Sequence, residues 1–416
     1  MLWLDYYKKM SFKNKNIFIT GISGFAGSHI ARHLLNNGAN VYGLLRRRAD
    51  GSLPQNIKYL GIENSIELLE GDVRDISSIA AALDHSQPDF IFHLAAQSFI
   101  PSSFISPTEI MDTNCGGTAN LLEAVRTSGM DPVIVFAGSS EEYGLTFASD
   151  SQYKRALEKY GAIFPPPIAI PELPITETSP LRPMSPYAVS KVYGDFIMRN
   201  YHTCYGTKTV ISRSFNNEGA GRGKMFVTAT ITNQVMQYQR GEIDKIMIGN
   251  VNAFRDWSHI DDVVSGYCLL AQKGTYGEVY NQGSQRTNSI LSYLLLSLES
   301  AGFTIDKIKA IKGGKTVENP TEIDVSEAFG LRFEKTRADK LLLDGKIEFH
   351  LQDSGIIVFT DKGKITIGFD ADRFRPADVP ILLTRTDKIR QLGFKANHSL
   401  KDIISDQLDY YGDPDR

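Results

Sequence analysis

The segment Ser185-Pro186-Tyr187-Ala188-Val189-Ser190-Lys191 contains a phenol and an ammonium at helical spacing. Ser185 can cap a helix through its hydroxyl, and proline suits the first helical position. Tyr187 and Lys191 would then lie one turn apart on the same helical face. An ammonium held nearby lowers the pKa of a phenol from about 10 toward that of a usable base. Because this spacing alone more often marks a solvated helix face, its meaning depends on the other motifs.

A second candidate group, Ser139-Ser140-Glu141-Glu142, follows a predicted strand at residues 133–137. Ligands bind at the carboxyl ends of parallel strands in open α/β sheets. A serine hydroxyl at this place can hydrogen-bond a sugar hydroxyl beside the phenol. A dehydrogenase that uses serine, tyrosine and lysine needs no carboxylate here, so Glu141 indicates a second proton transfer. The alternative is that Glu141 is only a solvated carboxylate at the rim of a cleft. A second glutamate next to it, Glu142, makes the pattern less specific for catalysis.

Three glycines separate the first predicted strand from the helix that follows it. Gly21, Gly24 and Gly27 have the spacing G-x-x-G-x-x-G. Glycine lets the backbone turn tightly and approach a diphosphate, whose charge is stabilised at the helix N-terminus. The order of strand, glycines and helix favours a dinucleotide-binding loop over a plain tight turn.

Arg46 lies at the end of the second predicted strand, where an acidic residue would hold the ribose hydroxyls of NAD. An arginine suits a 2′-phosphate, so the sequence favours NADP, with NAD as the alternative. The run from Arg46 to Arg48 could also be a solvated surface or a subunit contact. Asp72, after the third predicted strand, is expected either to hydrogen-bond the adenine amine or to cap the next helix.

The elements that would position these groups alternate between strands and helices. Short apolar runs predict strands at residues 16–20, 41–45, 66–69, 90–93, 133–137 and 209–212. Helical patterns lie between them, notably at 118–126 and 187–201. This order predicts a Rossmann-type α/β fold with a doubly wound parallel sheet. We expect an N-terminal extension over residues 1–15, a cofactor-binding domain over 16–214 and a smaller substrate-binding lobe over 215–416.

Two segments do not fit this alternation. Residues 145–175 contain a short helical pattern at 153–160 and three consecutive prolines, which suggest an excursion over the surface near the site. Residues 303–374 contain predicted strands at 346–351, 355–360 and 364–369, with Asp361-Lys362-Gly363 as a hairpin turn. We interpret the second segment as an inserted β-meander, for which an oligomer contact, a lid and a spacer all remain open.

The composition excludes several classes of protein. Hydrophobic residues make up 42% of the chain and charged residues 22%, as in ordinary globular proteins. The net charge of −3 argues against a nucleic-acid or membrane-surface partner. No apolar run has the roughly 20 residues that a membrane span needs, and no signal-peptide pattern opens the chain. The scattered Cys115, Cys204 and Cys268 predict neither a metal site nor a disulfide, and the chain is expected to be cytoplasmic.

Several further motifs occur in a consistent order along the chain. They are the glycine loop, Leu94-Ala95-Ala96-Gln97-Ser98, Asn114 with Gly117-Thr118, Ser139-Ser140-Glu141, Tyr187 with Lys191, Phe215-Asn216-Asn217-Glu218-Gly219, Arg222-Gly223, Phe226-Val227-Thr228, Arg255-Asp256-Trp257-Ser258-His259, Arg375-Pro376-Ala377-Asp378-Val379 and Leu392-Gly393-Phe394. The first five resemble an extended short-chain dehydrogenase/reductase, and together all of them resemble the GDP-mannose 4,6-dehydratase family. The resemblance covers roughly residues 16–411 outside the two inserted segments.

The resemblance implies roles for particular residues. The catalytic positions are Ser139, Glu141, Tyr187 and Lys191. The cofactor contacts are Gly21, Ser23, Gly24, Phe25, Ala26, Gly27, Arg46, Arg47, Asp72, Val73, Leu94, Ala95, Ala96, Ser98, Asn217 and Arg222, together with Tyr187 and Lys191. The nucleotide-sugar contacts are Ser98, Ser140, Asn216, Val227, Arg255 and Arg375. The chain departs from the family at Asn216-Asn217-Glu218, where the usual sequence is Asn-His-Glu.

The activity implied by the resemblance is conversion of GDP-mannose to GDP-4-keto-6-deoxymannose, with internal hydride transfer through bound NADP. The family also implies a homodimer or homotetramer. A dehydratase for a UDP-sugar or another nucleotide sugar, an epimerase and a decarboxylase are the alternatives within the family. Epimerases of this fold generally lack a glutamate at the position of Glu141. A non-catalytic NADP-binding regulatory protein would be expected to have lost Tyr187 or Lys191, and both are present.

Overall fold

Seven parallel strands form the central sheet of the computed structural model, which describes residues 12–47, 49, 51–375 and 377–413. The strands are arranged in the order β11-β6-β5-β4-β1-β2-β3. Their bounds are β1 Asn16–Thr20, β2 Asn40–Leu45, β3 Glu67–Glu70, β4 Phe90–His93, β5 Val133–Ala137, β6 Thr209–Ser214 and β11 Val279–Gln282. The six strands predicted from the sequence are confirmed, and so is the doubly wound parallel fold. Most of the predicted extension, residues 1–11, lies outside the described residues.

Helices cover both faces of this sheet, which is why its central strands are continuous apolar runs. Ile17 and Ile19 pack with α1 (Phe25–Asn36) and α10 (Ile260–Lys273) on one face. Phe18 points to the other face, where it packs with α3, α6 and α8. The bounds of these helices are α3 Ile76–Ser86, α6 Gly117–Ser128 and α8 Pro186–Tyr205. The alternation of side chains along a strand therefore connects β1 to both helical layers.

The central sheet takes its edge strand from far along the chain. Strand β11 pairs with β6 in parallel, with Val279 opposite Ile211 and Gln282 opposite Ser214. The helix before it, α10, also packs on this sheet. The central sheet therefore contains strands from both sides of the domain boundary expected after residue 214.

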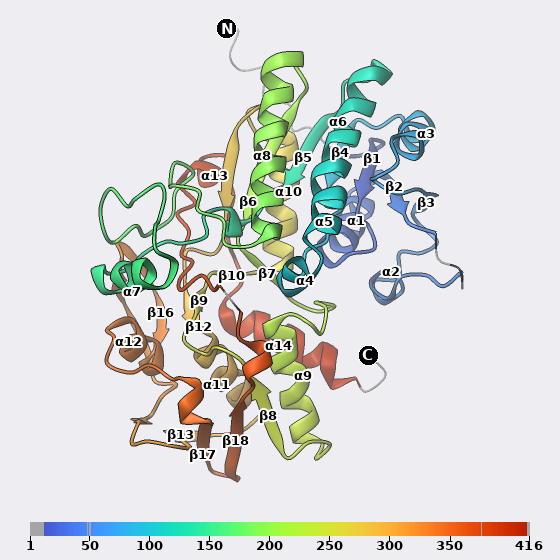
Figure 1. The fold of residues 1–416 in the computed structure, drawn as a ribbon. Coiled ribbons are helices and arrows are strands. Elements are labelled where there is room, and N and C mark those ends of the chain that lie inside the picture. The colour runs from blue at the N-terminus through green and yellow to red at the C-terminus, as the bar shows by residue number, and fades with distance from the viewer. Residues whose placement is uncertain (1–11, 48, 50, 376, 414–416) are drawn as a thin grey trace, which may run out of the picture.

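A second lobe lies below the central sheet in Figure 1. Its five-stranded sheet has the order β14-β13-β17-β18-β8 and packs against α9, α11 and α14. The strands are β8 Lys245–Ile248, β13 Ile305–Ala310, β14 Thr316–Glu318, β17 Gly355–Thr360 and β18 Gly363–Phe369. The helices are α9 Val227–Gln239, α11 Ile290–Ser300 and α14 Leu400–Gly412.

The segment 303–374 is built into this lobe, because β18 pairs in parallel with β8. The strands expected at 355–360 and 364–369 are confirmed, and residues 361–362 form the turn between them. The strand expected at 346–351 is wrong: residues 347–350 are irregular and η4 (Leu351–Asp353) is a 3₁₀ helix. Phe349 is buried there, and its N–H donates to the Asn252 side chain (2.9 Å). The apolar pattern reflects core packing rather than strand pairing.

Part of the second inserted segment, residues 323–343, lies beside the first at one flank of the molecule (Figure 1). Leu173 from the first and Phe333 from the second are buried in one hydrophobic cluster. Arg155 Nη1 lies 3.1 Å from Glu348 Oε2 across the same contact. The elements here are α7 Asp150–Tyr160, the antiparallel pair β15 Ile323–Ala328 and β16 Leu331–Thr336, and α12 Arg337–Leu343.

Short elements complete the chain. The helices are α2 Gln55–Tyr59, α4 Ile100–Ile105, α5 Pro107–Ile110, the π-helix η2 Met111–Gly116, the 3₁₀ helices η3 Ser140–Glu142 and η5 Ala371–Arg373, and α13 Asp387–Gln391. The strands are β7 Asn216–Glu218 paired with β10 Trp257–His259, and β9 Phe254–Arg255 paired with β12 Asn288–Ser289. Among the described residues, no helix combines the length and the apolar character that crossing a membrane requires.

Candidate functional site

A cleft of about 1610 Å³ opens at the carboxyl ends of the central strands and extends to the second lobe. All of the catalytic, cofactor and nucleotide-sugar residues predicted from the sequence line it. A typical small-molecule site has a volume of about 300–1,000 Å³. This cleft is therefore large enough for two ligands side by side.

The glycine loop forms one end of the cleft. Gly21 has φ +77°, and a Cβ at this residue would lie 2.7 Å from the backbone nitrogen of Ala95. A Cβ on Gly27 would lie 2.3 Å from the carbonyl oxygen of Gly21. Helix α1 begins at Phe25, and no side chain of the described residues caps it. Its first backbone N–H groups are thus left to bind an anion, and the loop fits the diphosphate of a dinucleotide.

Arg46 and Arg47 are exposed at the rim beside this loop, as a 2′-phosphate contact requires. Asp72 also lines the cleft, but its carboxylate is bound by Arg74, with Nη2 2.7 Å from Oδ2. The Arg74 guanidinium lowers the pKa of Asp72. The alternative in which Asp72 caps the next helix is wrong, because Asp75 caps α3 by accepting the Ser77 N–H (2.9 Å).

Helix α8 carries the phenol and the ammonium, and it begins as the sequence predicts. The Ser185 hydroxyl accepts the Ala188 N–H (3.1 Å), and Pro186 is the first helical residue. Lys191 Nζ donates to the carbonyl of Ala137 at the end of β5 (2.7 Å). Both Tyr187 and Lys191 are buried. The helix start and the end of the strand thus meet at one point in the cleft.

Burial decides the protonation of this pair. It lowers the pKa of Lys191 to about 8, while the negative charge of Glu142 acts in the opposite direction. Burial raises the pKa of Tyr187 well above its ordinary value, whereas a hydrogen bond with Ser139 lowers it. The expectation that a neighbouring ammonium brings the phenol toward a lower pKa is wrong for these residues taken alone, because desolvation is the larger effect.

The turn after β5 places Ser139 and Glu141 opposite this pair. Ser139 caps η3, its hydroxyl accepting the Glu141 N–H (3.2 Å). The Ser139 side chain lies near the Tyr187 phenol and lowers its pKa, so the two catalytic segments meet here. Glu141 lines the cleft within the same turn. The structure therefore brings together a hydroxyl, a phenol, an ammonium and a carboxylate.

Asn216 and Asn217 line the cleft between the central sheet and the second lobe. Their side-chain oxygens are buried and have no hydrogen-bond partner among the described residues. The guanidinium carbon of Arg222 lies over two aromatic rings, 5.4 Å from the ring centroid of Phe25 and 3.5 Å from that of Phe226. Because buried polar atoms are nearly always hydrogen-bonded in native proteins, the two amide oxygens fit partners supplied by a ligand.

Arg255 is anchored from behind the cleft. It is 5% exposed, its Nη2 lies 2.9 Å from Asp378 Oδ1, and its Nη1 donates to the Val379 carbonyl (2.7 Å). Asn250 donates to the other oxygen of Asp378 (3.0 Å). The sequence reasoning missed Asp378 and Asn250 as site residues, although Asp378 stands in the motif that contains Arg375. It also missed other residues that line the cleft, such as Asn56, Phe99, Lys224, Tyr267 and Arg373.

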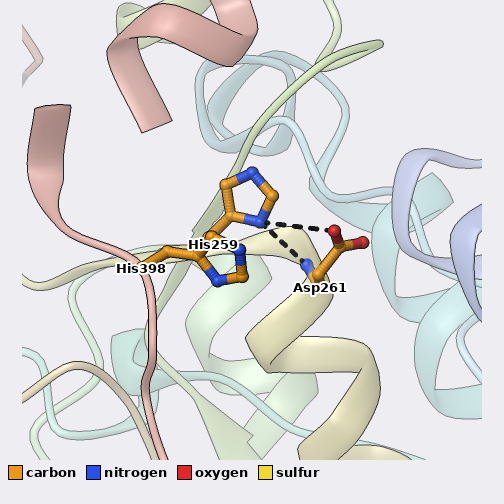
Figure 2. Close-up of side chains that lie close together, drawn as sticks. All are labelled: His259, Asp261 and His398. Carbon is orange, nitrogen blue, oxygen red and sulfur yellow. Dashed lines mark hydrogen bonds and ion pairs between the residues drawn. The ribbon is translucent and has the colours of Figure 1, made fainter. Parts of the chain in front are cut away.

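A cluster of ionisable groups lies outside this cleft, at the start of α10 (Figure 2). Candidate ligand atoms of His259, Asp261 and His398 lie within 4.8 Å of one another. His259 Nδ1 accepts the Asp261 N–H (3.2 Å), and its Nε2 lies 3.2 Å from Asp406. The rings of His259 and His398 are stacked, with centroids 4.1 Å apart and planes at 19°. Lone pairs in stacked rings run side by side instead of converging, so we interpret the cluster as a helix cap.

Comparison with known proteins agrees with this geometry. The model of the "NAD dependent epimerase/dehydratase family" matches residues 17–283. A GDP-mannose 4,6-dehydratase of Yersinia enterocolitica is 30% identical over 95% of this chain and 93% of its own length. GDP-mannose 4,6 dehydratase 1 of Arabidopsis thaliana is 32% identical over 74% of this chain and 81% of its own. The structure of RMD from Pseudomonas aeruginosa complexed with NADPH has a TM-score of 0.65 at 20% identity, covering 96% of this chain and all of that one.

Proposed function

The chain belongs to the NAD dependent epimerase/dehydratase family, among relatives of the GDP-mannose 4,6-dehydratases, and on that premise we propose that it is a nucleotide-sugar 4,6-dehydratase acting on GDP-mannose. The observation that carries the proposal is Glu141, a carboxylate that lines the same cleft as Ser139 and Tyr187. A simple oxidoreductase of this fold has no use for that carboxylate. An enzyme that also removes water needs it.

NADP is the proposed cofactor. The glycine loop would hold its diphosphate, Arg46 and Arg47 its 2′-phosphate, and Asn217 and Arg222 the nicotinamide side. The amide oxygen of Asn217 has no partner among the described residues, and Gly21 and Gly27 leave space for the backbone to approach a ligand; both observations support this assignment. When bound, NADP would supply the hydride acceptor for carbon 4 of the sugar and the hydride donor for carbon 6.

The residues of the chain would move the protons. Tyr187 takes the proton of the sugar 4-hydroxyl as a phenolate, whose negative charge the Lys191 ammonium stabilises before the transfer, and Ser139 holds that hydroxyl in place. The ketone formed at carbon 4 acidifies the proton on carbon 5. Glu141 accepts that proton and passes one to the hydroxyl that leaves carbon 6 as water. Ser98, Ser140, Asn216, Val227, Arg255 and Arg375 are proposed to bind the nucleotide sugar.

We further propose that the chain works as a homodimer or homotetramer in the cytoplasm. Val189, Tyr193 and Phe196 are 45%, 39% and 53% exposed and follow one another on a single face of α8. Exposed apolar faces of this kind are typical of contacts between proteins. Cys115, Cys204 and Cys268 are free thiols, which agrees with a reducing compartment. Light scattering of the purified protein will give the mass of the assembly.

The experiment that tests the proposed function is incubation of the purified protein with GDP-mannose, without an added reductant, and measurement of the product mass. UDP-glucose is the control substrate. Loss of one water from GDP-mannose alone would support both the reaction and the substrate. Water loss from UDP-glucose alone would keep the reaction and contradict the substrate, whereas no change in either mass would contradict the proposed function.

Replacing Arg46 by aspartate should move the cofactor preference from NADP toward NAD. The substitution removes the cation proposed for the 2′-phosphate and adds an anion that can bind ribose hydroxyls. A charge-assisted hydrogen bond contributes about 1.5–3 kcal/mol, so we expect the ratio of the two dissociation constants to change about tenfold or more. Titration of both cofactors into the wild type and the variant measures this ratio. An unchanged ratio would contradict the role of Arg46.

A further inference from the structure

Glu142 follows the proposed catalytic Glu141 and has no part in the chemistry described above. We propose that Glu142 is a positioning residue, which holds the Ser139–Glu141 turn in its working arrangement and ties it to the helix that carries Tyr187 and Lys191. The inference rests on the proposed function. The two adjacent glutamates then have different roles. Glu141 lines the cleft and acts on the substrate, whereas Glu142 is 0% exposed and supports the turn from inside the protein.

Both oxygens of the Glu142 carboxylate are engaged. Oε1 accepts the backbone N–H of Ser139 (2.8 Å), and Oε2 accepts Nε–H of Arg213 (3.1 Å). The room for this carboxylate exists because residue 138 is glycine: a Cβ on Gly138 would lie 2.7 Å from Oε1. Glu142 therefore fixes the backbone of the turn from inside the protein.

The backbone fixed in this way directs two catalytic groups. The hydroxyl of Ser139 accepts the Glu141 N–H (3.2 Å), and the Ser139 side chain lies near the Tyr187 phenol, whose pKa it lowers. If the Ser139 N–H were released, the orientation of its own hydroxyl and the start of the short helix that carries Glu141 would both lose their support. One buried carboxylate thus sets the direction of a hydroxyl and of a second carboxylate.

The partner of Glu142 is shared with the catalytic helix. Arg213, on β6, also lies 2.9 Å from Asp195, one of the buried residues of α8. Asp195 in turn lies 2.5 Å from Arg199, and Arg213 Nη1 donates to the Tyr143 hydroxyl (3.1 Å). The ion pairs therefore join the turn after β5 to the helix of Tyr187 and Lys191. A buried carboxylate with this set of partners is costly to disturb.

The charge of Glu142 has a second effect on the catalytic helix. It raises the pKa of Lys191 against burial, and Cys115 acts in the same direction. Burial raises the pKa of Glu142, and Asp195 acts in the same direction, whereas Arg213, the Ser139 N–H and Lys191 lower it. The charge of Glu142 also raises the pKa values of Tyr143 and Tyr187. Since the Lys191 ammonium is needed in its charged form, its contribution is lost as the pH rises through its pKa. Removing the charge of Glu142 should lower the pKa of Lys191, so the variant should lose activity at a lower pH than the wild type.

Glu142→Gln tests the proposal, with Asp195→Asn as the matched control. A glutamine cannot serve both donors, because its amide nitrogen must face either Ser139 N–H or Arg213 Nε. Asp195→Asn disturbs the same guanidinium but leaves the bond to Ser139 in place. For GDP-mannose dehydration by the full-length protein, we expect Glu142→Gln to lower kcat about a hundredfold with little change in KM, the loss that a misplaced catalytic group causes. The alkaline limb of its pH profile should move to lower pH, and Glu142→Asp should restore part of kcat.

Hydrogen–deuterium exchange of the peptide that contains Ser139 gives a readout independent of activity. Faster exchange of this peptide in Glu142→Gln than in Asp195→Asn or the wild type would support the proposal. Equal loss of kcat and equal exchange in the two variants would overturn it, since both would then report only a weakened ion cluster. If the wild type dehydrates no nucleotide sugar, the proposed function fails, and the exchange comparison still decides whether Glu142 holds the turn.

Discussion

Replacing Glu141 by glutamine is expected to stop the loss of water from the nucleotide sugar while leaving cofactor binding intact. The carboxamide keeps the shape of the side chain in the cleft but cannot accept the proton from carbon 5. General acid–base groups contribute about 10²–10⁴-fold to rate, so dehydration should fall by that factor. The mass of the product, measured after single and multiple turnovers, gives the rate of water loss.

The variant should retain the earlier step, because Ser139, Tyr187 and Lys191 are unchanged. A transient rise in the absorbance of the reduced cofactor, without water loss, would show that carbon 4 is still oxidised. Glu123→Gln is the matched control: this glutamate is ion-paired with Arg126 on α6 and does not line the cleft. Dehydration by Glu141→Gln at the rate of the control would reject the role given to Glu141.

Replacing Tyr187 by phenylalanine should abolish the first step as well as the second. The ring still fills its buried place beside Lys191, but the sugar 4-hydroxyl then has no proton acceptor. We expect a loss of about 10²–10⁴-fold in the oxidation of carbon 4, and no accumulation of reduced cofactor. Stopped-flow absorbance of the reduced cofactor with GDP-mannose follows this step directly.

Tyr205→Phe is the control for this loss, since Tyr205 lies at the exposed end of the same helix, at 57% exposure. It should oxidise carbon 4 at the rate of the wild type. Binding of NADP to Tyr187→Phe separates a chemical defect from a misfolded site, because Gly21, Gly27 and Arg46 are untouched. A variant that lacks the phenol and still oxidises carbon 4 would remove Tyr187 as the base.

The fold was predictable because its central sheet is buried on both faces. Strands such as β1 and β4 are continuous apolar runs in this setting, and turn residues end them. The strand expected at 346–351 failed for the same kind of reason: a buried Phe349 produces an apolar pattern whether or not a strand is paired. Which apolar runs pair depends on neighbours that are distant in the sequence, such as β8 for β18.

The site residues were predictable as a set because their motifs stand at the carboxyl ends of predicted strands, and these ends meet in any parallel sheet. The electrostatics of these residues could not be predicted from the sequence. The raised pKa of Tyr187 results from burial, which spacing along a helix does not reveal. Glu142 is buried while the adjacent Glu141 lines the cleft, and the burial of Glu142 depends on an ion pair with Arg213 on β6. The position of Arg255 depends in the same way on its ion pair with Asp378.

Strand β11 also determines when the cofactor lobe can be finished during synthesis. Its partner β6 ends at Ser214, and β11 begins only at Val279. Until then the emerging chain carries an unpaired parallel edge, and α10, which covers one face of the same sheet, is also incomplete. Unpaired edges recruit other strands, so this interval is when a nascent chain is most exposed to aggregation. A fragment that ends at residue 214 would keep that edge open permanently, and expression of the cofactor lobe alone should extend to residue 282.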